Sequence, residues 1–309
     1  MSLPIISRKR KIFAVLCTFW IPVKRIRKKY RAILLMGFFN WIRTKKYERT
    51  HAFNHTLAIG AIMKDEGPYL KEWLEYHMMV GVEKFYLYDN GSSDDTMDIV
   101  RPYVERGVVD LIDFPGSAKQ MAAYRDVINR YSYDSKWIAF IDLDEFLVPV
   151  VGGDIKDILL SLPDFAELVV SWVIYGSSGL VKRPKGLVLE NYKHHADKSW
   201  GIKSIVNPRF VVTMANPHCN LVAGYIVDEN GKKLGYIDQT NNPPSCNKIR
   251  CNHYITKSYE EYIKRRSRPT ATTSLPEANF VEKFKISDRN EILDLTMDPF
   301  IEKLKERGV

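Results

Sequence analysis

Residues 137–146 read Trp-Ile-Ala-Phe-Ile-Asp-Leu-Asp-Glu-Phe, and this stretch decides the fold prediction. An apolar run ends abruptly in three carboxylates: Asp142, Asp144 and Glu145. A short, continuous apolar run is typical of a buried strand in a parallel sheet. Ligands of open α/β sheets bind at the carboxyl ends of such strands. The three acids are therefore expected where a ligand would bind.

The spacing of the first two acids indicates a cation site. Asp142 and Asp144 are two residues apart, so in an extended chain their side chains point the same way and Leu143 points the other way. No Lys or Arg lies beside them in the sequence, so the two carboxylates would repel each other unless they share a cation. Mg²⁺ or Mn²⁺ is expected, because such ions often complete their coordination with substrate phosphates. The alternative is a solvated loop after a strand.

Charge is distributed unevenly along the 309 residues. The net charge is +9, but residues 1–50 hold 14 Lys and Arg against one acid, Glu48. The remaining residues hold 32 basic and 36 acidic side chains, a net charge of −4. The length suits one large α/β domain or two smaller ones. We therefore expect a slightly acidic globular body with a basic arm that attaches to an anionic surface.

The arm combines basic clusters with two apolar runs, residues 12–23 and 32–42. Both runs are shorter than the roughly 20 residues that a membrane-spanning helix needs. Their aromatic residues between basic clusters favour an element that lies in the interface of an anionic membrane. Two alternatives are a nucleic-acid-binding arm and a helical pair packed on the body. Because of the many large apolar residues, no nucleic-acid partner is expected.

Four cysteines are too few for a disulfide scaffold of this size, so a reducing compartment is expected. A zinc site is a weaker alternative. Its ligands would be Cys246, Cys251 and His253 with the pair His218-Cys219, but the spacing lacks a second tight cysteine pair.

The body begins with alternating strand and helix patterns. Strands are expected at residues 57–63, 84–88, 108–114 and 137–141, and helices at 68–80, 96–106 and 117–131. This order predicts a parallel sheet with covering helices. A polar turn, residues 89–96, follows the second strand and is a weak signal of a nucleotide site.

The pattern loosens after Phe146. Helices are expected at residues 155–162 and 259–266, and strands at 167–175, 203–206 and 209–214. We divide the chain into a membrane-associating arm, a catalytic body and a C-terminal amphipathic helix with its tail: residues 1–50, 51–285 and 286–309.

Six stretches together resemble the nucleotide-sugar glycosyltransferases of the GT-A fold, in particular the family 92-like group that borders on family 2. They run in the family's order between residues 57 and 268: 64–77, 85–94, 142–146, 175–179, 203–206 and 253–258. The resemblance implies an α/β, Rossmann-like fold with a mostly parallel central sheet. One departure is Arg268-Pro269, where the family tends to have Arg-Gly.

The resemblance also implies roles for single residues. Asp144 would bind the metal, with His253 as a further ligand, and Asp142 would support either the metal, as a ligand, or the donor ribose. The donor would contact Lys257 through its diphosphate and Asp89 through its base, and the segment Lys64-Asp65-Glu66 would border the same pocket. An inverting transfer also needs a general base, for which the candidates are Asp197, Glu190 and Glu145. Glu145 could equally be a structural carboxylate that orients the metal ligands.

The implied function is a metal-dependent, inverting transfer of a sugar from a UDP-linked donor to a saccharide or lipid-linked acceptor. It would serve the synthesis of a surface polysaccharide or glycolipid, at the cytoplasmic, inner face of a membrane. One alternative is an inactive scaffold or glycan-binding protein that kept the fold. Another is a nucleotidyltransferase, although residues 64–68 are not the Gly-rich basic loop that such an enzyme would show.

Overall fold

The structure is a computed structural model, and it describes residues 3–198, 200–214, 216–235, 244–267 and 279–309. The departure at Arg268-Pro269 lies outside these residues. A large curled sheet has the strand order β3-β2-β1-β4-β8-β6-β12-β5, with β11 pairing beside β6. Its strands are β1 (His55–Met63), β2 (Lys84–Asp89), β3 (Val109–Asp113), β4 (Ser135–Phe140), β5 (Glu145–Pro149), β6 (Glu167–Ile174), β8 (Ile202–Val206), β11 (Ile226–Val227) and β12 (Ile249–His253).

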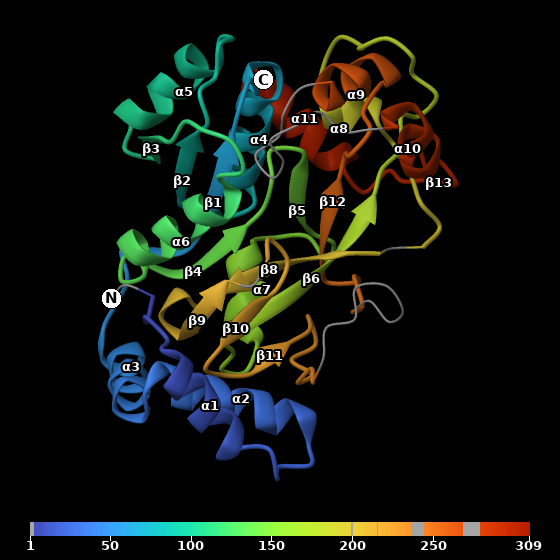
Figure 1. The fold of residues 1–309 in the computed structure, drawn as a ribbon. Coiled ribbons are helices and arrows are strands. Elements are labelled where there is room, and N and C mark those ends of the chain that lie inside the picture. Colours follow the sequence, from blue (N-terminus) through green and yellow to red (C-terminus); the bar gives the residue numbers. More distant parts are fainter. Residues whose placement is uncertain (1–2, 199, 215, 236–243, 268–278) are drawn as a thin grey trace.

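Helices cover both faces of this sheet (Figure 1). The helices of the body are α4 (Gly67–Met79), α5 (Thr96–Glu105), α6 (Gln120–Tyr131), α7 (Ile155–Ser161), α8 (Val188–Asn191), α9 (Tyr259–Arg266), α10 (Phe280–Ser287), α11 (Asp298–Glu306) and the short 3₁₀ helix η1 (Pro208–Phe210). Two small strand pairs lie outside the sheet: β9 (Val211–Met214) with β10 (Asn220–Val222), and β7 (His194–His195) with β13 (Ile292–Leu293).

Strand β1 explains why both faces are covered. Leu57, Ile59 and Ala61 face the core beneath α4 and α5, whereas Ala58 and Ile62 face the core beneath α6. Alternate residues of a strand point to opposite faces, so an unbroken apolar strand needs cover on both sides. The strands β3, β2, β1 and β4 pair in parallel, as the βαβ pattern predicts. The predicted α/β fold with a mostly parallel sheet is confirmed.

Part of the sheet was not predicted. Strand β5 begins with Glu145, the third of these acids, and pairs antiparallel with β12, which places His253 opposite Glu145. Strand β4 pairs antiparallel with β8. The predicted strand at 209–214 begins with η1. The predicted C-terminal helix is present as α11, and before it lies β13, which pairs with β7.

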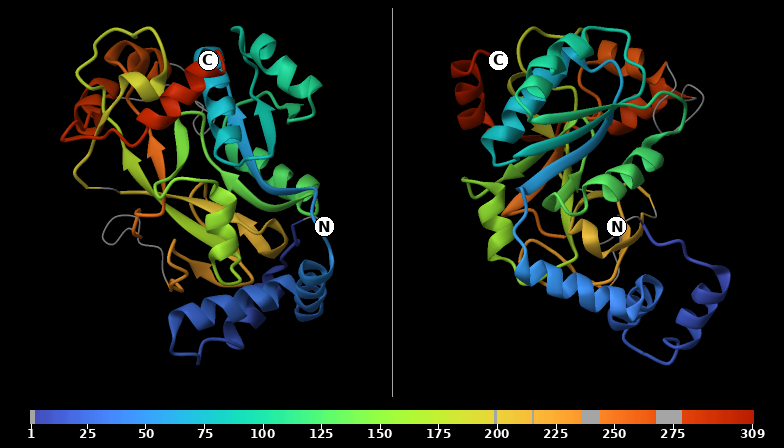
Figure 2. Two further views of the ribbon diagram at one scale, coloured as in Figure 1. Left: turned by 180° about the vertical axis from the view of Figure 1, so that it is seen from behind. Right: turned by 90° about the vertical axis from the view of Figure 1, so that its left-hand side faces the viewer.

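The arm forms three helices, α1 (Arg8–Leu16), α2 (Lys24–Met36) and α3 (Phe38–Thr50), at the end of the molecule opposite α9 and α11 (Figure 2). Helix α2 buries Ile33, Leu35 and Met36 against the body, and the Trp41 indole donates to the Ala223 carbonyl at 2.9 Å. The structure therefore shows arm helices packed on the body, which was one of the two alternatives to an element that lies in a membrane interface. The three-part division of the chain stays a prediction.

The arm also keeps large apolar side chains in solvent. Phe19, Trp20 and Phe39 are 65%, 69% and 79% exposed. Among the described residues, the longest helices are too short and too polar to cross a bilayer.

Glu167 on β6 is a buried acid whose ionisation should make the stability of the fold depend on pH. Its side chain is wholly buried, where it accepts hydrogen bonds from Ser204 and Asn220 at 2.6 and 3.0 Å. Burial raises the pKa of Glu167 from 4.5 to about 7, despite these bonds. A group whose pKa is higher in the folded state stabilises the fold below its unfolded pKa, and this stabilisation is lost as the pH rises through the folded pKa.

We expect the wild type to lose on the order of 3 kcal/mol of unfolding free energy relative to Glu167→Gln between about pH 4.5 and about pH 7. Urea denaturation of both proteins at about pH 5 and about pH 8 measures this difference. The comparison isolates Glu167, because other buried acids such as Glu72 are present in both proteins. The prediction would be contradicted if the free energies of unfolding of the two proteins changed with pH by the same amount.

Candidate active site

Asp142 and Asp144 lie on the turn between β4 and β5, and Glu145 is the first residue of β5. The Glu145 amide donates to the Asp142 carbonyl at 3.1 Å, and the Glu145 carboxylate accepts the Asp142 amide at 2.8 Å. The Trp73 indole of α4 donates to the Glu145 carbonyl at 2.8 Å. The turn is thus fixed at both its backbone and its side chains, which positions the carboxylates.

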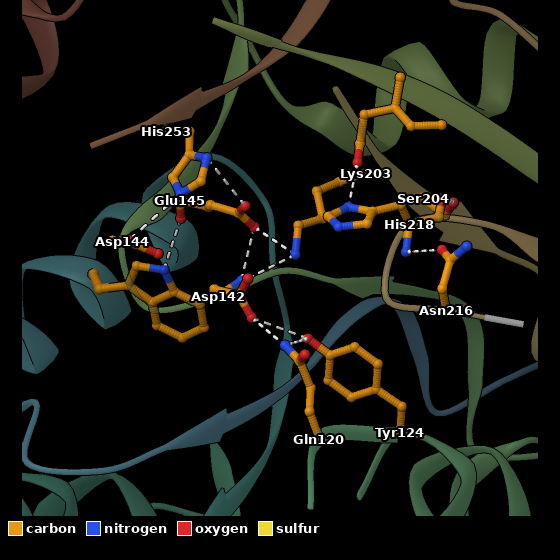
Figure 3. Close-up of polar contacts among 12 residues, drawn as sticks. Gln120, Tyr124, Asp142, Asp144, Glu145, Lys203, Ser204, Asn216, His218 and His253 are labelled. Atoms are coloured by element: carbon orange, nitrogen blue, oxygen red, sulfur yellow. Dashed lines mark hydrogen bonds and ion pairs between the residues drawn. The ribbon is translucent and has the colours of Figure 1, made fainter. Parts of the chain in front are cut away.

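A buried lysine from β8 lies between two of these acids (Figure 3). The Lys203 ammonium is 2.8 Å from Asp142 Oδ2 and 3.1 Å from Glu145 Oε2. Lys203 is wholly buried. No Lys or Arg lies beside the acids in the sequence, but the fold supplies a cation from β8, a strand about 60 residues away that pairs with β4.

Helix α6 holds the other oxygen of Asp142. The Gln120 amide donates to Asp142 Oδ1 at 2.8 Å and the Tyr124 hydroxyl at 3.2 Å. Burial alone would raise the pKa of Asp142, but Lys203 holds it below its usual value. Both oxygens of Asp142 are thus engaged by the protein, which fits a supporting role better than direct metal coordination.

Asp144 has different partners. Its Oδ2 contacts the Arg265 guanidinium of α9 and lies 3.4 Å from His253 Nε2. Burial would raise the pKa of Asp144, but Arg265 and His253 hold it well below its usual value. Among the described residues, nothing donates to Asp144 Oδ1, although this atom is buried. An ionised carboxylate with a free oxygen beside an imidazole is a donor set that suits a divalent cation.

The full predicted metal set is not assembled. In the part of the chain that the structure describes, no three His, Cys, Asp or Glu side chains gather as metal ligands do. This finding applies to Asp142, Asp144 and His253, and also to the cysteines and histidines of the zinc alternative. Asp144 and His253 fit the ion, Asp142 does not in this arrangement, and the metal assignment stays a prediction.

A cavity of about 470 Å³ lies next to Asp144. Arg265 lines this cavity and also contacts Asp144, so its side chain separates the carboxylate from the cavity. Further lining cations are Lys257, Lys264 and Arg183. Cations that converge on a cleft can neutralise phosphate groups.

Backbone strain coincides with this cavity. Asp65 and Lys257 both line it and adopt left-handed conformations, with φ values of +52° and +50°. Such conformations in residues other than glycine are typical of functional sites. The Lys257 ammonium lies 3.6 Å from the centre of the Tyr69 ring, and burial lowers the pKa of Lys257. Glu66 also lines the cavity, as predicted for its segment, whereas Lys64 is an exposed residue just after β1.

The predicted nucleotide-base contact, Asp89, lies at the end of β2. Its carboxylate accepts the Ser92 amide at 3.1 Å and the Ser92 hydroxyl at 2.5 Å, so it stabilises its own turn. The Asp65 carboxylate accepts the Ser93 amide at 2.7 Å, which fastens the same turn to the end of β1. The cavity is therefore bordered by two loops that are hydrogen-bonded to each other, at the carboxyl ends of parallel strands.

Comparison with known proteins decides the family. The model of glycosyltransferase family 92 matches residues 63–284, most of the chain. The chain belongs to glycosyltransferase family 92. A family 92 protein of Oryza sativa subsp. japonica is 28% identical over 239 residues, which are 74% of this chain and 38% of the relative. A second, of Ricinus communis, is 30% identical over 50% of this chain and 29% of the relative.

More distant relatives are named for an activity. A galactan β-1,4-galactosyltransferase of Arabidopsis thaliana is 25% identical over 33% of this chain and 21% of the relative. The chain thus spans less than half the length of these curated relatives. Among solved structures, Staphylococcus aureus TarS in complex with UDP aligns with a TM-score of 0.34 at 12% identity, over 50% of this chain and 47% of TarS. That likeness is too loose to carry a conclusion. The predicted family is confirmed.

The three general-base candidates of this family 92 chain lie in different surroundings. Glu145 is wholly buried, and burial raises its pKa to about 7 against the effect of Lys203. Glu190 pairs with Lys305 at 2.5 Å, and Asp197 pairs with Arg289 at 2.9 Å. Neither of the latter lines the cavity beside Asp144. The structure does not bring the three together, and it favours a positioning role for Glu145.

Several residues of the family 92 site are not predicted from the sequence. Lys203 is only part of the matching stretch 203–206, and Gln120, Tyr124 and Arg265 belong to no predicted site. The signal for Lys203 is a charged residue inside a five-residue strand that is otherwise apolar except for Ser204. A charge in a buried strand needs a partner, which the acids after β4 supply. No local pattern points to Gln120 or Arg265, because their partners are distant in sequence.

Proposed function

We propose that this chain transfers a sugar from a UDP-linked donor to a saccharide or lipid-linked acceptor, with inversion, aided by Mg²⁺ or Mn²⁺. Membership of family 92 supports the glycosyl transfer. The observation that carries the donor site is the ionised Asp144, with one free buried oxygen, next to a cavity whose lining includes four cations together with five acids.

The residues of the site would have separate roles in binding the ion and the donor. Asp144 and His253 would hold the ion, which would offset negative charge on the donor diphosphate and on the departing nucleotide. Lys257 and Lys264 line the cavity where the diphosphate would lie. Lys203, Glu145 and Gln120 hold the Asp142 turn in place, with Asp142 near the donor ribose. The Arg265 side chain is 36% exposed, so it can leave Asp144 and pair with a phosphate when the donor enters.

The proposal includes peripheral attachment to the cytoplasmic face of an anionic membrane, where a lipid-linked acceptor would be presented. Two features of the arm support it. The exposed side chains Phe19, Trp20 and Phe39 are large and apolar, and the arm carries a net charge of +13. Aromatic side chains with surrounding Lys and Arg are typical of interfacial membrane contacts.

Calorimetric titration of UDP tests the donor site. We expect UDP to bind at least ~10-fold more tightly with Mn²⁺ than with a chelator, because the ion offsets the diphosphate charge. Lys257→Gln should weaken binding about 10-fold, since it removes one charge-assisted contact. Lys182→Gln is the matched control, because Lys182 is exposed and does not line the cavity.

Two results would contradict the proposal. One is equal UDP binding with and without the ion, which would remove the metal from the donor site. The other is no binding of UDP, GDP or CDP under either condition. That second result would favour the scaffold or glycan-binding alternative, because the fold would then be present without a donor.

A further inference from the structure

A second cavity, of about 400 Å³, lies between the arm and the body. Its floor is apolar, formed by Trp41 of α3, Phe210 of η1, and Trp137 with Phe165, whose rings stack 5.5 Å apart. Trp137 lies near the start of β4, whereas Asp142 follows its end, so the two are about 16 Å apart along the strand. The cavity therefore lies at the opposite end of the sheet from the donor site.

Four lysines surround this cavity, and each lies over an aromatic ring. Lys29 and Lys233 lie 3.8 and 4.1 Å from the centre of the same Tyr225 ring. Lys136 lies 4.3 Å from the Trp137 ring, and Lys45 lies 5.6 Å from the Phe210 ring. The rings hold the ammonium groups at the edge of the cavity by cation–π attraction.

These cations outnumber the acids that could neutralise them. Within the described part of the chain, no carboxylate lies within 4 Å of Lys29, Lys136 or Lys233. The two acids that line the cavity are already engaged, Glu48 by Arg209 and Asp164 by Lys45 at 3.4 Å. Two ammonium groups on one tyrosine repel each other, and the nearby Lys29 and Lys233 lower the pKa of Tyr225. An anion between them would relieve this repulsion.

The cavity is continuous with the exposed apolar surface of the arm. Trp41 lines the cavity and stacks against Phe38, with ring centres 6.3 Å apart, and Phe38 contacts Phe39. Phe38 and Phe39 are 54% and 79% exposed. A lipid whose acyl chains contact these phenylalanines would place its headgroup near the lysines. The combination of an apolar floor, unpaired cations and an adjoining apolar surface matches an anionic amphiphile.

We propose that this cavity binds the headgroup of an anionic phospholipid in the bilayer on which the arm lies. The site would fix the orientation of the body on the bilayer. This inference rests on the membrane attachment in the proposed function, and it adds a defined lipid site to a surface that would otherwise bind by diffuse charge alone.

Flotation of the full chain with vesicles tests the site. Vesicles of phosphatidylcholine alone are compared with phosphatidylcholine containing about 20% phosphatidylserine. The cavity variant is Lys29→Gln/Lys136→Gln/Lys233→Gln. The control variant is Lys9→Gln/Lys11→Gln/Lys46→Gln, which removes the same charge from exposed arm lysines that do not line the cavity. Thermal unfolding checks that both variants are folded.

We expect the wild type to bind the anionic vesicles, and the cavity variant to bind at least ~10-fold more weakly than the control variant. Equal loss in both variants would overturn the lipid site and leave diffuse attachment intact. Failure of the wild type to bind anionic vesicles would overturn the membrane attachment itself. Displacement of the wild type by millimolar-range inorganic phosphate, at constant ionic strength, would assign the cavity to a free anion and overturn the lipid as its ligand.

Discussion

Replacing Asp144 with alanine is expected to lower the release of UDP from a UDP-sugar at least ~100-fold, because several kcal/mol of charge stabilisation would be lost. Asp144 is the acid with a free buried oxygen, and its pKa is held well below the usual value, so it is ionised at neutral pH. Asp144→Asn keeps the shape and removes only the charge. A similar loss in both variants would show that the carboxylate charge is what matters.

The measurement is UDP release from a panel of UDP-sugars with Mn²⁺ present, since the acceptor is not needed for donor hydrolysis. The fold should tolerate the change, because Arg265 is 36% exposed and can turn towards water. Asp98→Ala is the matched control: Asp98 also pairs with an arginine, Arg101 at 2.8 Å, but on the surface of α5. Wild-type rates in Asp144→Ala would overturn the metal and donor assignment, whatever the control does.

Local sequence patterns predicted the parallel half of the sheet and its acidic end. The apolar run before Asp142 and the turn formers after Asp89 are visible within ten residues, and the structure places both at carboxyl ends of parallel strands. The antiparallel half depends on pairings across long sequence distances, such as β5 with β12. These short strands carry no alternation that distinguishes them from loops.

The same reason explains what was missed in the site. Asp142 and Asp144 are close in sequence but have separate cations, Lys203 from β8 and Arg265 from α9. A shared metal was inferred because neither cation is visible beside the acids. The prediction of a membrane-associating arm likewise rests on composition. Composition does not show that Ile33 and Leu35 of α2 are buried while Phe39 is exposed. Burial on one face and exposure on the other are tertiary properties.

Replacing Lys203 with methionine is expected to lower the free energy of unfolding by about 3 to 5 kcal/mol, the usual cost of removing one partner from a buried ion pair. The ammonium lies between Asp142 and Glu145 and is wholly buried, so the variant would leave two carboxylates without their cation. Urea denaturation at neutral pH measures the change. Lys156→Met is the matched control, because Lys156 pairs with Glu83 at 2.7 Å but both side chains are partly exposed, and it should cost about 1 kcal/mol or less.

The origin of the cost can be separated from lost packing. Without Lys203, burial would raise the pKa of both carboxylates in the folded state, so the variant should lose stability as the pH rises and regain it in acid, where both acids are protonated. Adding Glu145→Gln to Lys203→Met should therefore restore part of the stability at neutral pH. If Lys203→Met costs no more than Lys156→Met, or if its deficit does not shrink in acid, then Lys203 is not the cation that keeps the Asp142 turn charged and in place.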